Sequence, residues 1–348
     1  MSALPLPAVL DRFRPRLGRA AMPAMAVLAV TAVAMSPDPY LHATAARMLP
    51  LALLAVSVAV VTGHAGLPTL GQVAPYAAGA YLTARLAVAG IDLAVVHLLA
   101  AAVLGAVVAG LLGAVLVRHR GTVFLMLSVA VAELTAITAA QWRAVSGGTD
   151  GLAGIPAPRL VPGLAPLLGE RTVLVYAAAV AVPVIGAAVW SLAADRRLLL
   201  TAARDNEHRA RACGHPVTAY LWAVHTGAGV LAGVAGALLI HTHRWITPQD
   251  VGFGTAALML LAVVIGGARS LPAAAIGAVL VLTVRDMVAV AWPGHGPLLI
   301  GVLFVAAVYG LPGGLAALPA RLRRRQPPPT RPDQPETLVA ATSVRSVS

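Results

Sequence analysis

Few side chains in this chain are placed for covalent chemistry, and those that stand out are suited to binding. Glu133 lies near the middle of the apolar run 122–141, where a lone carboxylate costs about 2.5–3.5 kcal/mol to insert into a bilayer. We therefore expect Glu133 to face the interior of a helix bundle, where it either lines a pathway for a solute or forms a structural hydrogen bond. Its candidate partners are Arg85, Thr135 and Thr138.

A second candidate is the segment 63–81, GHAGLPTLGQVAPYAAGAY, in which glycine and proline interrupt an otherwise apolar run. A helix broken at membrane depth can present free backbone N–H and C=O groups to a substrate. Small residues also allow helices to pack closely, so both interpretations stay open. The candidate pathway residues here are Gly63, Gly66, Thr69, Gly71 and Gln72.

A glycine-rich loop, SGGTDGLAGIP at 146–156, follows the run that contains Glu133. Glycines that alternate with Ser, Thr and Asp expose backbone groups, so this loop could bind a zwitterion or dock a partner. The candidate residues are Gly147, Gly148, Thr149, Asp150 and Gly151.

The long charged stretch 195–216, DRRLLLTAARDNEHRARACGHP, separates two apolar runs and holds five arginines. Asp195 is a suitable N-cap, and Gly214 followed by Pro216 is a typical helix end. We expect a short helix on the cytoplasmic face that docks a partner. The alternative is a solvated loop whose charges only set the topology.

Charge spacing within this stretch also favours a helix. Asp205–Arg209 and Glu207–Arg211 are acid-before-base pairs four residues apart. Each such pair stabilises a helix by about 0.2–0.5 kcal/mol.

The chain lacks the residues that several other activities require. It contains no lysine, and a Walker A loop needs one to reach the phosphates of ATP. His225, His241 and His243 have no Cys, Asp or Glu at ligand spacing, and no nucleophile–base set is evident. We therefore expect no catalytic residue, metal or cofactor in this chain, and any ATP must be bound by partner subunits.

Composition predicts an all-α polytopic membrane protein. Hydrophobic residues make up 59% of the chain and charged residues 11%, against about 25% charged in soluble domains. The net charge of +12 comes from arginines that lie mostly in polar gaps between apolar runs. Aromatic residues do not alternate with them as on a nucleic-acid surface, so we expect no nucleic-acid partner.

The apolar runs are near the roughly 20 residues that a bilayer requires. They predict about ten transmembrane helices, with a broken or re-entrant helix near 63–81. With the N-terminus inside, eighteen arginines lie in inner gaps and four in outer gaps, which places both termini, Ser348 included, in the cytoplasm. The predicted spans are 20–36, 43–61, 70–89, 94–117, 122–141, 172–194, 218–240, 254–268, 273–291 and 297–311.

This topology divides the chain into a cytoplasmic segment 1–19, a transmembrane domain 20–317 and a tail 318–348. The transmembrane domain carries a cytoplasmic loop at 195–217 and a periplasmic loop at 142–171. The tail is polar and rich in proline, so we expect it to be disordered. The first span resembles a secretory signal, but the many spans that follow favour an uncleaved helix.

Four blocks resemble the inner-membrane permease subunits of branched-chain amino acid ABC transporters, of the LivM type. Gly63–Tyr81 is similar to the family's G-Y-A-G-x-x-S-L-G-x-x-x-F-x-G-x-G-A-Y. Leu127–Glu133 and Trp142–Pro156 are similar to its T-L-x-x-A-E and W-x-x-x-T-G-G-x-D-G-L-x-G-I-P. Ala202–Gly214 is similar to its A-x-R-E-N-E-x-x-A-x-A-x-G, and Leu298–Leu315 to its closing P-x-G-L block.

The resemblance implies one permease subunit of a bacterial inner-membrane importer. Its expected partners are a second, LivH-like permease, two ABC ATPase subunits and an extracytoplasmic solute-binding protein. The expected solute is a branched-chain amino acid or a related small polar solute, such as urea or a short-chain amide. Residues 202–214 would be the coupling helix to the ATPase, with the contact residues Arg204, Asp205, Asn206, Glu207, Arg209, Arg211 and Gly214.

Two other functions remain as alternatives. An ion-coupled secondary transporter needs ionisable groups within the membrane, and only Glu133, Arg85 and the Arg285–Asp286 pair qualify. A membrane-embedded enzyme is less favoured, because the chain has no evident nucleophile and base.

Overall fold

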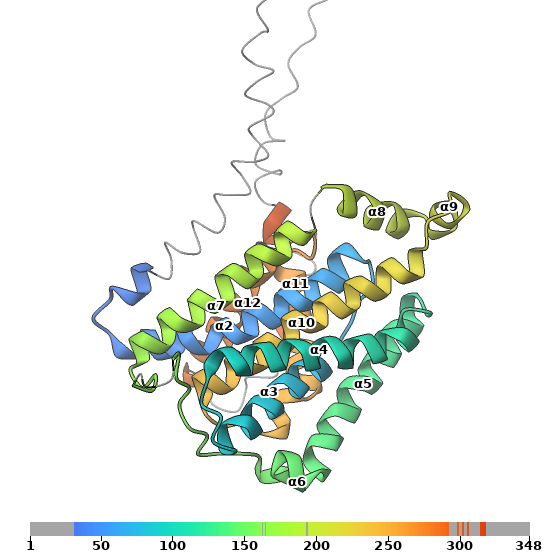
Figure 1. Ribbon diagram of the computed structural model, residues 1–348. Coiled ribbons are helices and arrows are strands. Elements are labelled where there is room, and N and C mark those ends of the chain that lie inside the picture. The colour runs from blue at the N-terminus through green and yellow to red at the C-terminus, as the bar shows by residue number, and fades with distance from the viewer. Residues whose placement is uncertain are drawn as a thin grey trace, which may run out of the picture. The chain divides into compact units, whose positions relative to one another are not determined.

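The computed structural model describes residues 31–161, 163, 165–192, 194–291, 298, 301–302, 305 and 314–317. Within these residues the chain is helical, with two isolated β-bridges and no strand (Figure 1). The predicted all-α class is thereby confirmed. The longer helices are α2 (Pro39–Ala59), α3 (Val73–Val88), α4 (Ala94–Leu116), α5 (Gly121–Gln141), α7 (Glu170–Ser191), α8 (Ala194–Asp205), α10 (Val217–His243), α11 (Phe253–Gly266) and α12 (Leu271–Ala291).

Short helical turns connect these elements. The first of them, η1, is a π-helical turn that continues α2. The others lie in the loops on either side of the bundle. The turns are η1 (Val60–His64), α6 (Arg143–Ser146), η2 (Gly148–Asp150), α9 (Glu207–Ala212), η3 (Pro248–Val251) and η4 (Leu315–Ala317).

Six described helices are long and apolar enough to cross a membrane. α3 and α11 match the expected spans 70–89 and 254–268 but have only 16 and 14 residues. The expected spans 20–36 and 297–311 lie almost wholly outside the described residues, as do segments 1–19 and 318–348, so the count of ten stays a prediction. The six helices are Pro39–His64, Ala94–Leu116, Gly121–Gln141, Glu170–Ser191, Val217–His243 and Leu271–Val288.

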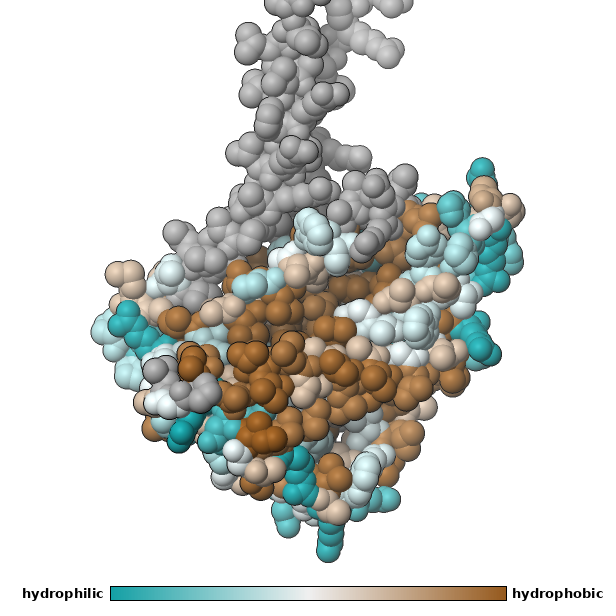
Figure 2. Space-filling model, viewed as in Figure 1, coloured by the Kyte–Doolittle hydropathy of each residue, from teal (hydrophilic) through white to brown (hydrophobic). Residues whose placement is uncertain are grey.

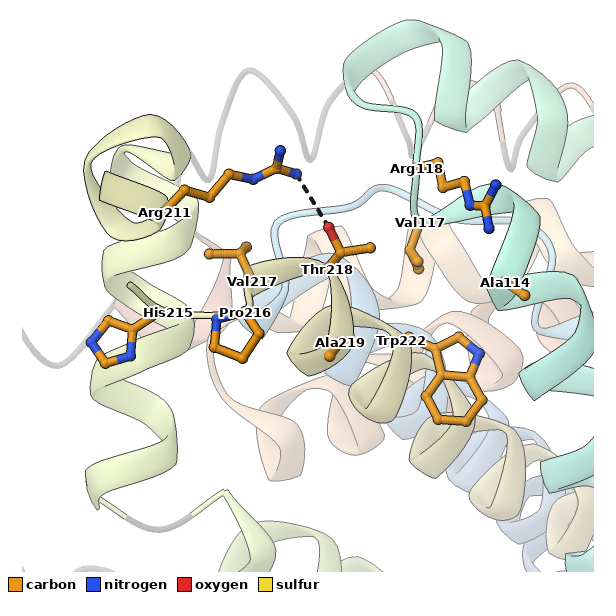
Figure 3. A pocket seen from close by; sticks show the side chains of 10 residues that line it. All are labelled: Ala114, Val117, Arg118, Arg211, His215, Pro216, Val217, Thr218, Ala219 and Trp222. Atoms are coloured by element: carbon orange, nitrogen blue, oxygen red, sulfur yellow. Dashed lines mark hydrogen bonds between the residues drawn. The ribbon is translucent and has the colours of Figure 1, made fainter. Parts of the chain in front are cut away.

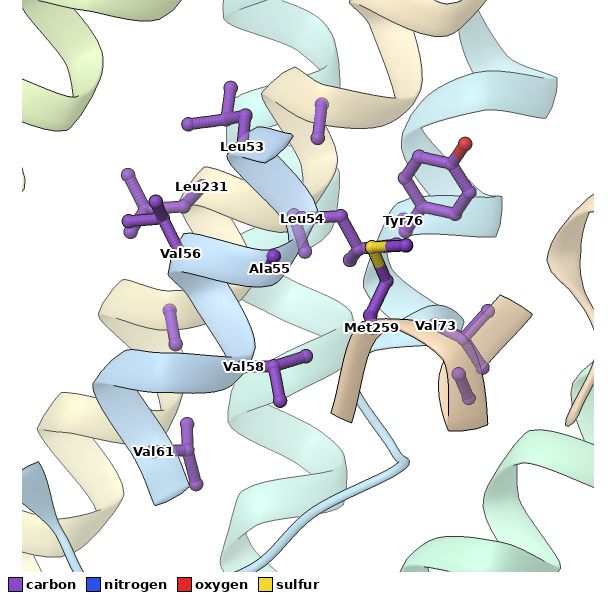
Figure 4. Packing of buried hydrophobic residues seen from close by; sticks show 14 of the residues in the cluster. Leu53, Leu54, Ala55, Val56, Val58, Val61, Val73, Tyr76, Leu231 and Met259 are labelled. Atoms are coloured by element: carbon purple, nitrogen blue, oxygen red, sulfur yellow. The ribbon is translucent and has the colours of Figure 1, made fainter. Parts of the chain in front are cut away.

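The centre of the described bundle is formed by α2 and α10. In each, 72% of the most apolar stretch is buried, compared with 22% in α4 and α5. Leu54 and Val58 of α2 pack with Tyr76 of α3 and Met259 of α11 (Figure 4). Both faces of α2 and α10 therefore contact protein, whereas α4 and α5 lie at the periphery.

Glycines let α10 approach α4 and α3 closely. A Cβ atom on Gly233 would lie 2.1 Å from the carbonyl oxygen of Ala101 in α4, and one on Gly236 would lie 2.1 Å from that of Tyr76 in α3. A Cβ on Gly229 would lie 2.1 Å from the Cβ of Ala109. Small residues at such crossings allow backbones to touch. The Gly229-x-x-x-Gly233 pattern thus serves helix packing.

The outward face of α4 is apolar along its length. Its exposed large side chains recur every four residues, which places them on one stripe of the helix. Figure 2 shows apolar side chains across the middle of the visible face and hydrophilic ones toward opposite ends. This is the pattern of a lipid-facing surface. The stripe on α4 is Val95, Leu99, Val103, Val107, Leu111 and Val115.

The polar connections that are predicted to lie on the same side of the membrane are in contact with each other. On the inner side, Arg120 in the α4–α5 connection forms an ion pair with Glu207 of α9. On the outer side, Leu93 forms a β-bridge with Arg159, and Leu152 forms one with Ile246. α8 and α9 lie at one end of the bundle and α6 at the other (Figure 1). This arrangement agrees with the predicted sidedness of the described spans.

Candidate functional site

The helix break begins where α2 turns into the π-helical turn η1. The amide of Ala65 bonds to Val60 O at 3.3 Å, and the amide of Leu67 bonds to Val61 O at 3.2 Å. Gly66 then has a φ of +73°, a conformation that favours glycine. Helical structure resumes only at Val73. The predicted broken helix is therefore present, and α3 starts within the bundle.

Two glycines are required by the crowding at this break. A Cβ on Gly63 would lie 1.6 Å from the carbonyl oxygen of Ala268, in the α11–α12 connection, and one on Gly66 would lie 2.8 Å from Cγ of Arg204. In contrast, a Cβ on Gly71 would have only ordinary contacts, the nearest at 3.6 Å. Gly63 and Gly66 thus lie where three parts of the chain meet.

The polar residues that follow the break are enclosed by protein. Thr69 and Gln72 have no exposed surface. Ser57 Oγ donates to Gln72 Oε1 at 3.2 Å, and Gln72 Nε2 lies 3.4 Å from His225 Nδ1. These bonds satisfy polar groups that would be costly to leave unpaired in an apolar interior. In this conformation, Thr69 and Gln72 hold the start of α3 in place.

Ser128 of α5 also supports the break, and sequence reasoning did not single it out. Its hydroxyl accepts a bond from the amide of Leu70 at 3.1 Å and donates to Leu125 O at 2.7 Å. An amide of the non-helical connection before α3 is thereby satisfied. The only signal in the sequence was a serine within the apolar run 122–141.

Arg204 connects α8, in the charged stretch, to the break. Its Nη1 donates to Gly63 O at 2.5 Å, and its alkyl chain lies against Gly66. Gly63 and Arg204 are 141 residues apart in sequence, so the sequence placed them in separate candidate sites. The structure brings the two sites together at this one contact.

The charged stretch forms two helices, α8 and α9, and not the single helix expected from Asp195. α8 begins at Ala194, so Asp195 lies in its first turn and is not the N-cap. Asn206, with φ −156° and ψ 96°, breaks the helix, and its side chain accepts a bond from the amide of Arg209. Asn206 is therefore the N-cap of α9.

The helix break also changes the predicted charge pairs. Asp205 and Arg209 lie in different helices, and no ion pair joins these two described residues. Glu207 and Arg211 do pair, at 2.6 Å. Gly214 has a φ of +83° and follows the end of α9, which confirms the predicted helix stop. The Asp205–Arg209 prediction was wrong because Asn206 prefers to cap a helix.

Glu207 is fixed by arginines from within the chain. Arg120 donates to both carboxylate oxygens, at 2.7 and 2.9 Å, in a bidentate pair. This bond is the main reason that the pKa of Glu207 lies below its usual value, and Arg211 lowers the pKa further. Asp205, His208 and Arg209 are instead exposed. Sequence reasoning missed Arg120, whose only signal was its place in a short inner gap.

The glycine-rich outer loop is a tightly built turn. Gly147, Gly148 and Gly151 have φ values of +80°, +78° and +74°. A Cβ on Gly151 would lie 2.1 Å from the carbonyl oxygen of Ile246. Thr149 and Asp150 are exposed at the tip of the turn. The backbone thus presents these two side chains on the outer side of the bundle.

Glu133 does not face the bundle interior, contrary to the sequence expectation. The buried side chains of α5 are Phe124, Ser128, Ala132 and Ala139, and Glu133 lies outside this stripe and is exposed. Thr135 Oγ1 donates to Val131 O in its own helix. Among the described residues, Glu133 has no hydrogen bond or ion pair. The expectation assumed that one chain completes the bundle around α5.

Three buried polar side chains form a second hydrogen-bonded cluster, which the sequence did not predict. His97 Nδ1 lies 3.0 Å from His241 Nε2, and His241 Nδ1 lies 2.8 Å from the hydroxyl of Tyr176. These side chains join α4, α10 and α7 near their outer ends. The signal in the sequence was a polar residue near the outer end of each of three apolar runs.

These features define a polytopic helical membrane protein whose broken helix contacts α8, one of the two short helices formed by the charged stretch. A family model described as "Branched-chain amino acid transport system / permease component" matches residues 40–308. The chain belongs to this family of membrane permeases, which confirms the resemblance noted in its sequence.

Two curated relatives are similar to most of the chain. Both are described as "High-affinity branched-chain amino acid transport system permease protein LivM", one from Salmonella typhimurium (strain LT2) and one from Escherichia coli (strain K12). Each is 27% identical over 290 residues, which cover 76% of this chain and 67% of the relative. No solved structure matches the chain.

Proposed function

We propose that this chain is a permease subunit of an ABC importer and forms, with a second permease, the pathway for branched-chain amino acids or a related small polar solute. ATP hydrolysis in two separate ATPase subunits drives transport, and an extracytoplasmic binding protein delivers the solute. Membership of the permease family supports the transport role. The bacterial inner membrane is the expected location.

The observation that carries this proposal is the hydrogen bond from Arg204 to Gly63 O. α8 and α9 contain exposed side chains suited to docking, and Arg204 joins α8 to the end of the span Pro39–His64, where the helix breaks before α3. A shift of α8 would therefore act directly on the backbone of the break. This contact supports residues 202–214 as the segment that couples ATP hydrolysis to the pathway.

The exposure of Glu133 supports a second permease beside α5. An isolated carboxylate in contact with lipid is costly, whereas a partner subunit or a water-filled pathway would stabilise it. Thr149 and Asp150, at the outer end of the bundle, are candidates to meet the solute or its binding protein. Glu133 and the outer turn would then belong to the pathway between two permeases.

Coupling can be tested with Arg204→Gln in cells that express the chain with its partner subunits. We expect uptake of labelled leucine, isoleucine or valine to fall about tenfold or more, because a hydrogen bond from a charged donor is lost. ATP hydrolysis by the purified complex should continue. Arg269→Gln is the matched control, since Arg269 is an exposed cation in the α11–α12 connection.

Each component of the proposal has its own contradicting result. Normal uptake by Arg204→Gln would refute the coupling role of this contact. Uptake by the wild type that persists after ATP depletion and stops with an ionophore would favour the ion-coupled transporter. Uptake of urea or short-chain amides, without any of the three amino acids, would reassign the solute.

A further inference from the structure

A surface pocket of about 610 Å³ lies beside the inner end of α4, where α9 leads into α10. Two arginines and a histidine line it, each from a different part of the chain. Arg118 follows the end of α4, Arg211 belongs to α9, and His215 lies in the turn before α10 (Figure 3). Among the described residues, no acidic side chain lines this pocket. Its charge is therefore complementary to an anion.

Arg211 is held in a fixed orientation within this pocket. Its Nη2 bonds to Glu207 Oε1 at 2.6 Å and to Thr218 Oγ1 at 3.2 Å, while 54% of its side chain stays exposed. A guanidinium carries five N–H donors, so donors remain for a ligand. Arg118, on the opposite side in Figure 3, is also exposed. The pocket thus has a guanidinium group on each of two sides.

Apart from Thr218, the rest of the pocket lining is apolar. Ala114 and Val117 form one wall, on the helix that carries the exposed stripe of α4. Trp222 forms another, and its indole N–H donates to Gly110 O at 2.8 Å. Tryptophan favours the membrane–water boundary. The pocket therefore has a cationic part at the predicted cytoplasmic side and an apolar part along α4.

We propose that this pocket binds an anionic phospholipid of the inner leaflet. Arg211 contacts the phosphodiester, Arg118 and His215 add positive charge around it, and an acyl chain lies along Ala114 and Trp222. A free phosphate would satisfy only the cationic part, and the quaternary ammonium group of a zwitterionic phospholipid would be repelled by the cations around the pocket. This inference does not depend on the solute, but the pocket shares Arg211 with the segment proposed to couple ATP hydrolysis.

The test uses native mass spectrometry of the full-length chain, purified in detergent with the subunits that copurify with it. Phosphatidylglycerol, phosphatidylcholine and inorganic phosphate are added in turn. We expect phosphatidylglycerol to bind in preference to phosphatidylcholine. Arg118→Gln should weaken its binding about fivefold, the contribution of one arginine near a membrane surface. Arg269→Gln, which removes a cation elsewhere on the same side, should leave binding unchanged.

A second variant separates shape from charge. Ala114→Trp keeps every cation but fills the apolar part, so it should also reduce binding of phosphatidylglycerol. Equal binding of the two lipids by the wild type, or full binding by both variants, would overturn the proposal. If inorganic phosphate displaced phosphatidylglycerol completely, the pocket would be an anion site without a lipid-binding part, and the proposal would be wrong. Loss of bound lipid when the ATPase subunits assemble would assign the pocket to that protein interface.

Discussion

At the scale of single residues, Glu207 determines how α9 is held. Its bidentate pair with Arg120 joins α9 to the α4–α5 connection, and Arg211 adds a bond within the same helix region. Glu207 thus has a structural role inside the chain, whether or not it also contacts an ATPase subunit. The exposed neighbours Asp205, His208 and Arg209 are better placed to meet a partner directly.

Because the pKa of Glu207 is lowered in the fold, its ionised form stabilises the folded state. This stabilisation is present above the ordinary carboxyl pKa of 4.5 and is lost as the pH falls through the lowered value. Glu207→Gln should therefore lower stability by about 1 kcal/mol at neutral pH, measured by thermal unfolding in detergent. The difference from the wild type should vanish in acid. A difference that persists unchanged at low pH would contradict the ion-pair role, and Asp205→Asn serves as the control.

At the scale of helices, α10 packs because its glycines meet the backbones of α4 and α3. Gly227 lies on the same helix, but a Cβ there would have no neighbour within 4 Å. Gly227 and Gly233 are therefore the same residue type on the same helix, but only Gly233 is packed against another backbone. This difference provides a matched pair of substitutions.

We expect Gly233→Ala to lower the melting temperature of the purified protein and Gly227→Ala to leave it unchanged or raise it. At Gly233 the added methyl group must displace the backbone of Ala101, and overpacking of this kind costs about 1–3 kcal/mol. At Gly227 alanine only improves helix propensity. Equal melting temperatures for the two variants would show that the α4–α10 crossing is more tolerant than its geometry indicates.

At the scale of the whole molecule, α5 exposes both a carboxylate and large apolar side chains. Glu133 shares the outward part of this helix with Met126, Leu134 and Ile137. A single chain in lipid would leave Glu133 without a partner among the described residues. Association with another subunit would cover this face and pair or hydrate the carboxylate.

Glu133→Leu should therefore disrupt the assembly while leaving the isolated chain folded. We expect reduced copurification of the second permease and lower uptake, with an unchanged melting temperature of the chain itself. Thr122→Val, near the start of the same helix, is the control. If Glu133→Leu leaves both assembly and uptake intact, α5 faces lipid.

Much of the fold followed from the sequence, because membrane insertion depends on local properties. Run length and hydropathy predicted α4 and α5 to within a residue at each end, and Gly63–Tyr81 correctly indicated a broken helix. Gly214 correctly marked a helix end. The predictions that Glu133 faces the bundle interior and that Asp195 is an N-cap were wrong. The orientation of Glu133 depends on which helices surround α5, and the role of Asp195 depends on the residue at which α8 starts.

The sequence by itself determined the class and the family of this protein and predicted its sidedness, because apolar runs, arginine counts and short motifs are properties of the chain alone. Only the tertiary structure decided that Arg204 reaches Gly63, that Arg120 holds Glu207 and that Glu133 points outward. The first two are contacts between residues that are distant in sequence, and the third depends on which helices pack around α5. The packing of α2 and α10 at the centre decides which side chains meet, and no local pattern encodes that choice.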